Sequence, residues 1–108
     1  MKQDEKILQR QCEELLRWKH IPFLHLTTAI CRQVGGKWQT FSVEGNKGMP
    51  DFFIFLDGGT IFVELKTKKG RLKPEQIYWK EQVEKLDYKY YVIRSFEEFE
   101  KLIRTKIH

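Results

Sequence analysis

Two strongly apolar segments joined by Asp57-Gly58-Gly59 constrain the fold of this chain more than any other feature. The first segment, 51–56, is entirely apolar after its leading aspartate, which is typical of a buried strand. The second segment, 60–66, returns with a similar run of apolar and β-branched residues. A short link that contains glycine between two such segments predicts a tight turn. The sequence therefore predicts an antiparallel β-hairpin.

The residues before this hairpin predict a helix followed by strands. Apolar side chains recur at helical spacing over residues 4–18, and Pro22 follows the expected end of that helix. Residues 23–28 have the aromatic and β-branched content of a strand, and residues 38–43 suggest another short one. Residues 44–50 contain two glycines and a proline and are predicted to form a loop.

Two helices and a strand are predicted after the hairpin. Pro74 stands where the first turn of a helix tolerates a missing N–H. The inward stripe of that helix is expected to be Gln76, Trp79, Val83 and Leu86. Residues 88–94 predict a last strand, and Ser95 with Glu98 predicts a capping box that opens a final helix. This order predicts an α/β fold in which a central mixed β-sheet is flanked by helices.

Length and composition predict one folded domain over residues 1–108, because 108 residues with 41% hydrophobic content have room for a single core. No apolar stretch approaches the roughly 18 residues of a membrane span, and the polar N-terminus is unlike a secretory signal. Two cysteines, Cys12 and Cys31, are too few for a typical disulfide-rich secreted domain. We therefore expect a cytoplasmic protein of a bacterial or phage-infected cell, without membrane association.

The net charge of +5 is concentrated in one basic stretch after the hairpin. Six cations stand there against a single acid, Glu75: Lys66, Lys68, Lys69, Arg71, Lys73 and Lys80. Such a run is compatible with a solvated loop and also with a strip that faces phosphates. Composition does not decide between these two interpretations.

Two carboxylates and a lysine are expected to meet at one end of the hairpin. Asp51 opens the first strand, and Glu64 and Lys66 close the second. Residues i and i+2 of a strand share a face, so Glu64 and Lys66 are expected side by side. Magnesium prefers oxygen ligands, and a neighbouring lysine stabilises the charge that develops during phosphodiester hydrolysis. The grouping predicts metal-dependent phosphodiester chemistry, with a surface Glu–Lys pair at a strand end as the alternative.

The same motifs resemble those of a known family, the VRR-NUC family of the PD-(D/E)XK nuclease superfamily. The resemblance is carried by Gly48-Met49-Pro50-Asp51, by Ile61-Phe62-Val63 leading into Glu64-Leu65-Lys66, and by Lys69-Gly70-Arg71-Leu72-Lys73-Pro74-Glu75-Gln76. With an opening helix that is also similar, it covers about residues 5–96. It implies a restriction-endonuclease-like core and hydrolysis of DNA with Mg²⁺ or Mn²⁺ as cofactor.

Residue by residue, the resemblance implies that Asp51 and Glu64 are metal ligands, with the backbone carbonyl of Leu65 as a further ligand. Lys66 would be the catalytic lysine. Gln76, on the first turn of its helix, would face the site and contact the phosphate or a bound water.

The first helix would supply a further metal-binding acid, directly or through water. The resemblance favours Glu5 for this role, and Glu13 and Glu14 remain alternatives. Lys73 departs from the family pattern, which often has a small hydroxylated residue there that would cap the helix. Lys73 is expected to bind nucleic acid instead, together with Lys68, Lys69 and Arg71.

Because small members of this family are similar to resolvase-like enzymes, the resemblance implies a nuclease that selects branched DNA, such as a four-way (Holliday) junction, by structure and not by sequence. A homodimer is expected, because two active sites are needed to cut two strands symmetrically. The main alternative is a catalytically inactive protein of the same fold that binds nucleic acid or a protein partner.

Overall fold

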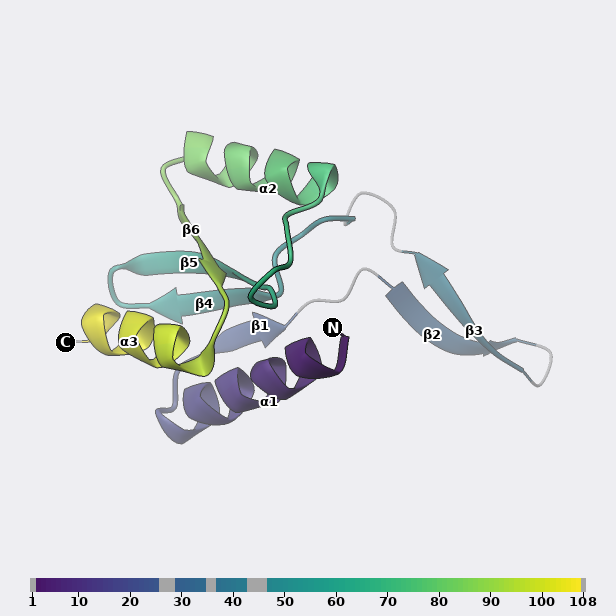
Figure 1. The fold of residues 1–108 in the computed structure, drawn as a ribbon, viewed down its shortest axis with the longest axis horizontal. Helices are drawn as coiled ribbons and strands as arrows, with labels where there is room; N and C mark the ends of the chain where they lie inside the picture. Colours follow the sequence, from purple (N-terminus) through teal and green to yellow (C-terminus); the bar gives the residue numbers. More distant parts are fainter. Residues whose placement is uncertain (1, 26–28, 35–36, 43–46, 108) are drawn as a thin grey trace.

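The computed structural model describes the backbone of residues 2–25, 29–34, 37–42 and 47–107, and the side chains of residues 4–25 and 47–107 (Figure 1). The elements, in chain order, are α1 (Lys2–Trp18), β1 (Phe23–His25), β2 (Ala29–Val34), β3 (Lys37–Ser42), β4 (Phe52–Leu56), β5 (Gly59–Leu65), α2 (Pro74–Lys85), β6 (Lys89–Ile93) and α3 (Phe96–Lys106). Among the described residues, no helix is both long enough and apolar enough to span a membrane.

The main sheet has the strand order β1-β4-β5-β6. The predicted hairpin is confirmed, because β4 and β5 pair antiparallel with Phe52 opposite Val63. The next strand, β6, pairs parallel to β5, and α2 makes the crossover between them. The sheet is therefore mixed, as the sequence predicts.

Helices cover both faces of this sheet (Figure 1). The larger core includes Cys12, Phe52 and Phe99, which come from α1, β4 and α3. On the opposite face, Phe62 and Tyr90 pack against Val83 of α2. Successive β5 side chains alternate between the two faces, as in any strand. Glu64, two residues after Phe62, therefore points to the α2 side.

The strands β2 and β3 form a separate antiparallel pair. The strand predicted over residues 38–43 corresponds to β3, whereas β2 was not predicted. The strand expected over residues 23–28 is observed only as Phe23–His25, and residues 26–28 lie outside the described part.

Two local expectations near the helix ends need correction. Leu86 is 70% exposed, so it does not belong to the inward stripe of α2. The helix ends at Lys85, and Asp87 takes a left-handed conformation that lets Tyr88 N–H reach the Val83 carbonyl, which closes a typical helix end. At the start of α3, Ser95 Oγ accepts from Glu98 N–H as predicted, but the Glu98 carboxylate accepts from Arg94 N–H and not from Ser95.

Candidate active site

The structure brings Asp51 and Glu64 together at neighbouring ends of β4 and β5. Leu65 N–H donates a hydrogen bond of 2.7 Å to Asp51 Oδ2, which ties the start of β4 to the end of β5. Both carboxylates line one cavity of about 390 Å³ with Gln76 and Lys73. Glu64 itself is only 3% exposed.

Burial makes this pair of carboxylates electrostatically unusual. The pKa of Glu64 is raised to about 9, first by burial and then by the negative charge of Asp51, and the nearby Lys66 offsets part of the rise. The pKa of Asp51 is also raised by burial, against the lowering effect of the Leu65 N–H and of His25. Two buried acids without enough positive charge around them favour binding of a cation.

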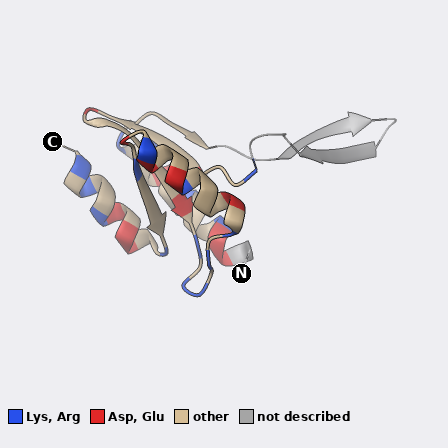
Figure 2. Ribbon diagram, turned by 90° about the horizontal axis from the view of Figure 1, so that it is seen from above, with Lys and Arg blue, Asp and Glu red and all other residues tan. Residues whose placement is uncertain are grey.

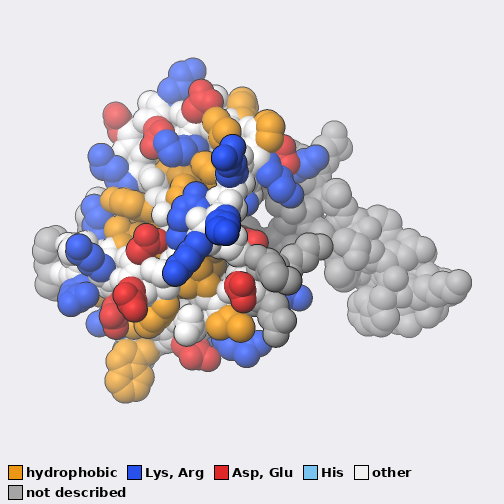
Figure 3. Space-filling view, viewed as in Figure 1, with side chains coloured by type: hydrophobic (Ala, Val, Ile, Leu, Met, Phe, Trp, Pro, Cys, Tyr) orange, Lys and Arg blue, Asp and Glu red, His pale blue; other side chains and the backbone are white. Residues whose placement is uncertain are grey.

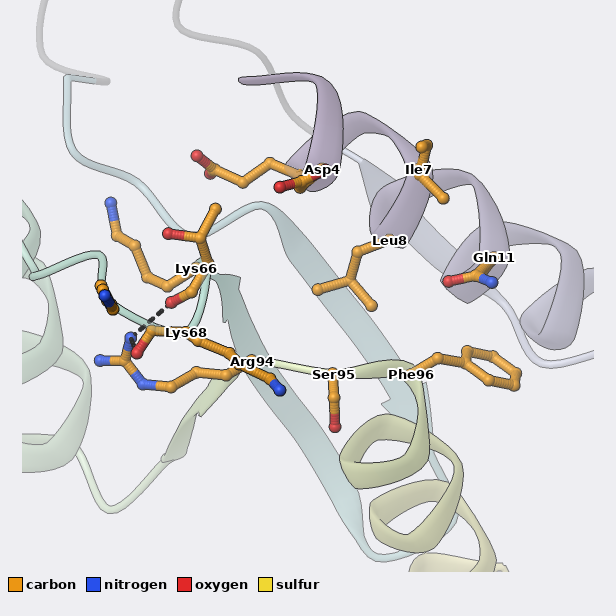
Figure 4. Close-up of a pocket in the computed structure, with 12 residues that line it drawn as sticks. Asp4, Ile7, Leu8, Gln11, Lys66, Lys68, Arg94, Ser95 and Phe96 are labelled. Atoms are coloured by element: carbon orange, nitrogen blue, oxygen red, sulfur yellow. Dashed lines mark hydrogen bonds between the residues drawn. The ribbon is translucent and has the colours of Figure 1, made fainter. Parts of the chain in front are cut away.

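Lys66 supplies one positive charge beside the pair. Its Nζ lies 3.9 Å from Glu64 Oε2, and the residue is 8% exposed. Lys66 also lines a second cavity, which lies between α1, the loop after β5 and the start of α3 (Figure 4). The lysine therefore stands at the boundary between the two cavities.

Gln76 connects α2 to the buried carboxylate. Its Nε2 donates a hydrogen bond of 2.9 Å to Glu64 Oε2, and its Oε1 accepts one of 2.8 Å from Lys73 N–H. The second bond occupies one of the backbone donors that a helix start leaves without a partner. Lys73 makes no side-chain capping bond of its own, so Gln76 replaces part of the missing cap.

The Leu65 carbonyl faces the side of β5 on which β4 begins. In an extended strand, the N–H and C=O of one residue point the same way, and Leu65 N–H points to Asp51. If the β4–β5 register continued, Pro50 would lie opposite Leu65. Proline has no N–H to donate. The proline before Asp51 therefore cannot extend the ladder to this carbonyl.

Glu5 is the helix acid whose charge acts on both carboxylates of the pair. Its negative charge raises the pKa of both Asp51 and Glu64, while Glu13 and Glu14 have no such effect on either carboxylate. Glu13 instead lies 3.6 Å from His25 and 4.0 Å from Arg17, and Glu14 is exposed. Glu5 lines the second cavity with Lys66 and does not line the one that contains Asp51.

The residues present fit a hard divalent cation. Glu64 Oε1 is buried and has no hydrogen-bond partner among the described residues. Within the same described part, no three His, Cys, Asp or Glu side chains converge on one point. The donors available are two carboxylates and a backbone carbonyl, which leaves room for the waters that Mg²⁺ usually retains. A contact from Glu5 would then be made through water.

Most of the basic stretch forms the loop between β5 and α2 (Figure 2), whereas Lys80 lies in α2. Lys68, Lys69, Arg71 and Lys73 are all exposed. Lys and Arg side chains gather near the centre of the face in Figure 3, where this loop and α2 lie. Of the four, Lys73 lines the carboxylate cavity, whereas Lys68 and Lys69 line the second one.

Comparison with known proteins assigns the fold and the family. The VRR-NUC domain family matches residues 2–97. The chain belongs to the VRR-NUC family. A solved structure described as a "VRR_NUC domain" superposes with a TM-score of 0.68 over 93% of this chain and 94% of that chain, at 24% identity. No curated protein matches the chain. The chain is thus a nuclease-type domain, and its mixed sheet is the α/β core that the sequence predicted.

The further residues that line the carboxylate cavity of this VRR-NUC domain include Gln9 and His25, to which sequence reasoning assigned no role in the site. His25 ends β1, and its Nδ1 lies 3.4 Å from Gln9 Nε2 on α1. The His25 ring packs on Phe52 with centroids 5.1 Å apart. The only sequence signals for them are a polar residue on the inward side of a helix and a histidine in a strand. Both patterns are common in residues without a functional role.

Proposed function

We propose that this VRR-NUC domain is a divalent-metal-dependent endonuclease that hydrolyses DNA phosphodiester bonds. The proposal rests on one arrangement: a buried pair of carboxylates, Asp51 and Glu64, with the Lys66 ammonium 3.9 Å from Glu64. Buried acids are unfavourable in a protein without a compensating cation. A site that concentrates them beside a lysine is typical of metal-assisted phosphoryl chemistry.

The metal, Mg²⁺ or Mn²⁺, would be held by Asp51, Glu64 and the Leu65 carbonyl, with Glu5 acting through water. When bound, the ion neutralises charge at the phosphate and makes a coordinated water more acidic. Glu64 Oε1, which has no hydrogen-bond partner within residues 2–25, 29–34, 37–42 and 47–107, supports this assignment, because a buried carboxylate oxygen without a donor is costly.

The protein side chains have separate roles in the proposed reaction. Lys66 holds or helps to deprotonate the attacking water, and it stabilises the negative charge that develops on the phosphate. Gln76 fixes the orientation of Glu64 through its 2.9 Å hydrogen bond, and it also lies in reach of the cavity to contact the phosphate or a bound water. Such partners of metal ligands commonly affect activity nearly as much as the ligands do.

Substrate binding is proposed to use the exposed cations Lys68, Lys69, Arg71 and Lys73. Contacts of lysine and arginine to phosphates carry no sequence information, so we propose selection of DNA by structure, with branched substrates such as four-way junctions preferred.

A homodimer is proposed, since symmetric cutting of two strands requires two sites. Light scattering after gel filtration should then give twice the 13.1 kDa mass of one chain.

The decisive experiment is cleavage of end-labelled duplex, flap and four-way-junction DNA in Mg²⁺, Mn²⁺ and EDTA. Lys66→Ala is compared with Lys101→Ala, an exposed lysine on α3. We expect cutting that needs the metal, is lost in Lys66→Ala and is unchanged in Lys101→Ala. If Lys66→Ala cuts like the wild type, the assignment of Lys66 fails. DNA binding without any cutting would instead support the inactive binding protein.

A further inference from the structure

Arg94, between β6 and α3, is half-buried and directs one guanidinium nitrogen, Nη1, onto carbonyls of the basic loop. Its Nη1 donates to the Thr67 carbonyl at 2.7 Å and to the Gly70 carbonyl at 2.6 Å. A longer contact of 3.4 Å reaches the Lys68 carbonyl (Figure 4). One arginine therefore binds three carbonyls of the loop that follows β5.

These carbonyls are the main partners of the guanidinium in the described part of the chain. No Asp or Glu there lies within ion-pair distance of Arg94, whose guanidinium binds loop carbonyls instead. Hydrogen bonds from a charged donor are stronger than those between neutral groups. The loop is thus held by hydrogen bonds from a charged donor, and the positive charge of Arg94 lies beside the loop carbonyls.

The carbonyls of Thr67, Lys68 and Gly70 point to Arg94, and this fixes the direction of the backbone N–H groups that follow them. In a trans peptide the N–H points opposite to the C=O, and the structure contains no cis peptide in its described residues. The N–H groups of Lys68, Lys69 and Arg71 therefore point away from Arg94. None of the three has a hydrogen-bond acceptor among the described residues, whereas Gly70 N–H closes the turn onto the Thr67 carbonyl at 3.2 Å.

The outer side of the loop thus combines backbone donors that have no acceptor in the described part of the chain with the exposed side chains of Lys68 and Lys69. Successive backbone N–H groups that point to one side of a turn form a concave site for an anion. Lys68 and Lys69, together with Arg94, line the cavity that Lys66 shares, so their side chains lie next to the proposed reaction centre.

We propose that Arg94 is a positioning residue that shapes the 67–71 loop into a binding surface for a DNA backbone phosphate near the one that is cut. The inference rests on the proposed nuclease function and extends it. In this role Arg94 acts through the loop carbonyls that it binds and is not itself the phosphate contact. The loop residues Lys68 and Lys69, with the three outward N–H groups, contact the phosphate.

The first test measures DNA affinity by fluorescence anisotropy in EDTA, where no cutting occurs, over a range of salt concentrations. Arg94→Gln removes the bonds to the loop, and Arg104→Gln removes the same charge from an exposed position of α3. We expect Arg94→Gln to weaken binding about tenfold and to lower the salt slope by about one to two, as for the loss of phosphate contacts. Arg104→Gln should change binding less than twofold. Equal effects of the two variants overturn the proposal.

A double-mutant cycle separates an effect through the loop from a direct contact. Lys68→Ala/Lys69→Ala should weaken binding alone, and adding Arg94→Gln to it should cause little further loss, because the groups that Arg94 positions are already absent. Losses that add fully would mean that Arg94 acts independently of the loop, against the proposal. Arg94→Lys, one bond shorter, keeps the charge and should recover part of the binding.

Limited trypsin digestion tests the loop without DNA or activity. Lys68, Lys69 and Arg71 are cleavage sites, and a loop held by Arg94 should be cut slowly. Arg94→Gln should speed cutting at these residues relative to cutting after Arg17 on α1, at a temperature where both proteins are folded by circular dichroism. Unchanged cutting overturns the positioning role. If the wild type binds no DNA while Arg94→Gln is digested faster, the nuclease proposal fails and the role of Arg94 in holding the loop stands.

Discussion

The side-chain amide of Gln76 donates a hydrogen bond of 2.9 Å to Glu64 Oε2 while its oxygen accepts from Lys73 N–H at 2.8 Å. These two bonds fix which end of the amide faces the carboxylate, because only the nitrogen can donate. One side chain thus links the start of α2 to a buried acid of β5. The helix start and the candidate site are therefore coupled, and changes at either end should affect the other.

Replacing Gln76 should affect both activity and stability. Gln76→Ala removes the bond that orients Glu64, so we expect a loss of at least tenfold in cleavage rate, typical of residues that support a metal ligand. The loss of the bond to Lys73 N–H should lower the free energy of unfolding by about 1 kcal/mol. Single-turnover cleavage and urea unfolding measure the two effects. Gln82→Ala, on the same helix, is the control and should leave the cleavage rate unchanged.

The raised pKa of Glu64 predicts an unusual pH dependence for the metal-free protein. The folded state keeps the proton up to about pH 9, while an unfolded glutamate releases it near 4.5. Between these values the folded state binds more protons, so stability in EDTA should fall as pH rises. Urea unfolding at pH 5.5 and 8 measures this difference. Glu64→Gln should remove much of it and exposed Glu100→Gln should not; stability that rises with pH in the wild type would contradict the prediction.

Gly48 should be irreplaceable in the segment that leads to Asp51. It has a φ of +87°, and a Cβ there would lie 2.5 Å from the Glu75 carbonyl oxygen. Gly48→Ala should lower the free energy of unfolding by about 2 kcal/mol or more, from strain and from the clash with backbone. Gly58→Ala is the matched control, because a Cβ there meets nothing within 4 Å. Thermal melting of both variants measures the contrast.

Lys73→Ser should move stability and DNA binding in opposite directions. Serine can accept a hydrogen bond at the helix start, which should add about 1 kcal/mol to the free energy of unfolding. Loss of the exposed ammonium beside the carboxylate cavity should weaken DNA binding and flatten its dependence on salt. Urea unfolding and anisotropy titrations in EDTA measure the two effects. Unchanged binding would show that Lys73 does not face phosphate.

The sequence by itself determined the local elements and the neighbourhood of the motif residues. Two runs of apolar residues joined by Asp57-Gly58-Gly59 specify the β4–β5 hairpin, and that hairpin alone brings Asp51 close to Glu64 and Lys66. Pro74 and Ser95 mark helix starts through the chemistry of their own backbone and side chain. These features were predictable because they depend on residues close together in the chain. The strand β2 carries a weaker pattern and was missed.

Only the tertiary structure decided which distant side chains meet. The bond from Gln76 to Glu64 requires α2 to pack on the β5 face, and the bonds from Arg94 to Thr67 and Gly70 require β6 to lie parallel to β5. His25 enters the carboxylate cavity because β1 pairs with β4. Such contacts follow from how helices and strands pack, and that packing depends on all the side chains that share the core. No periodicity within a single segment contains that information.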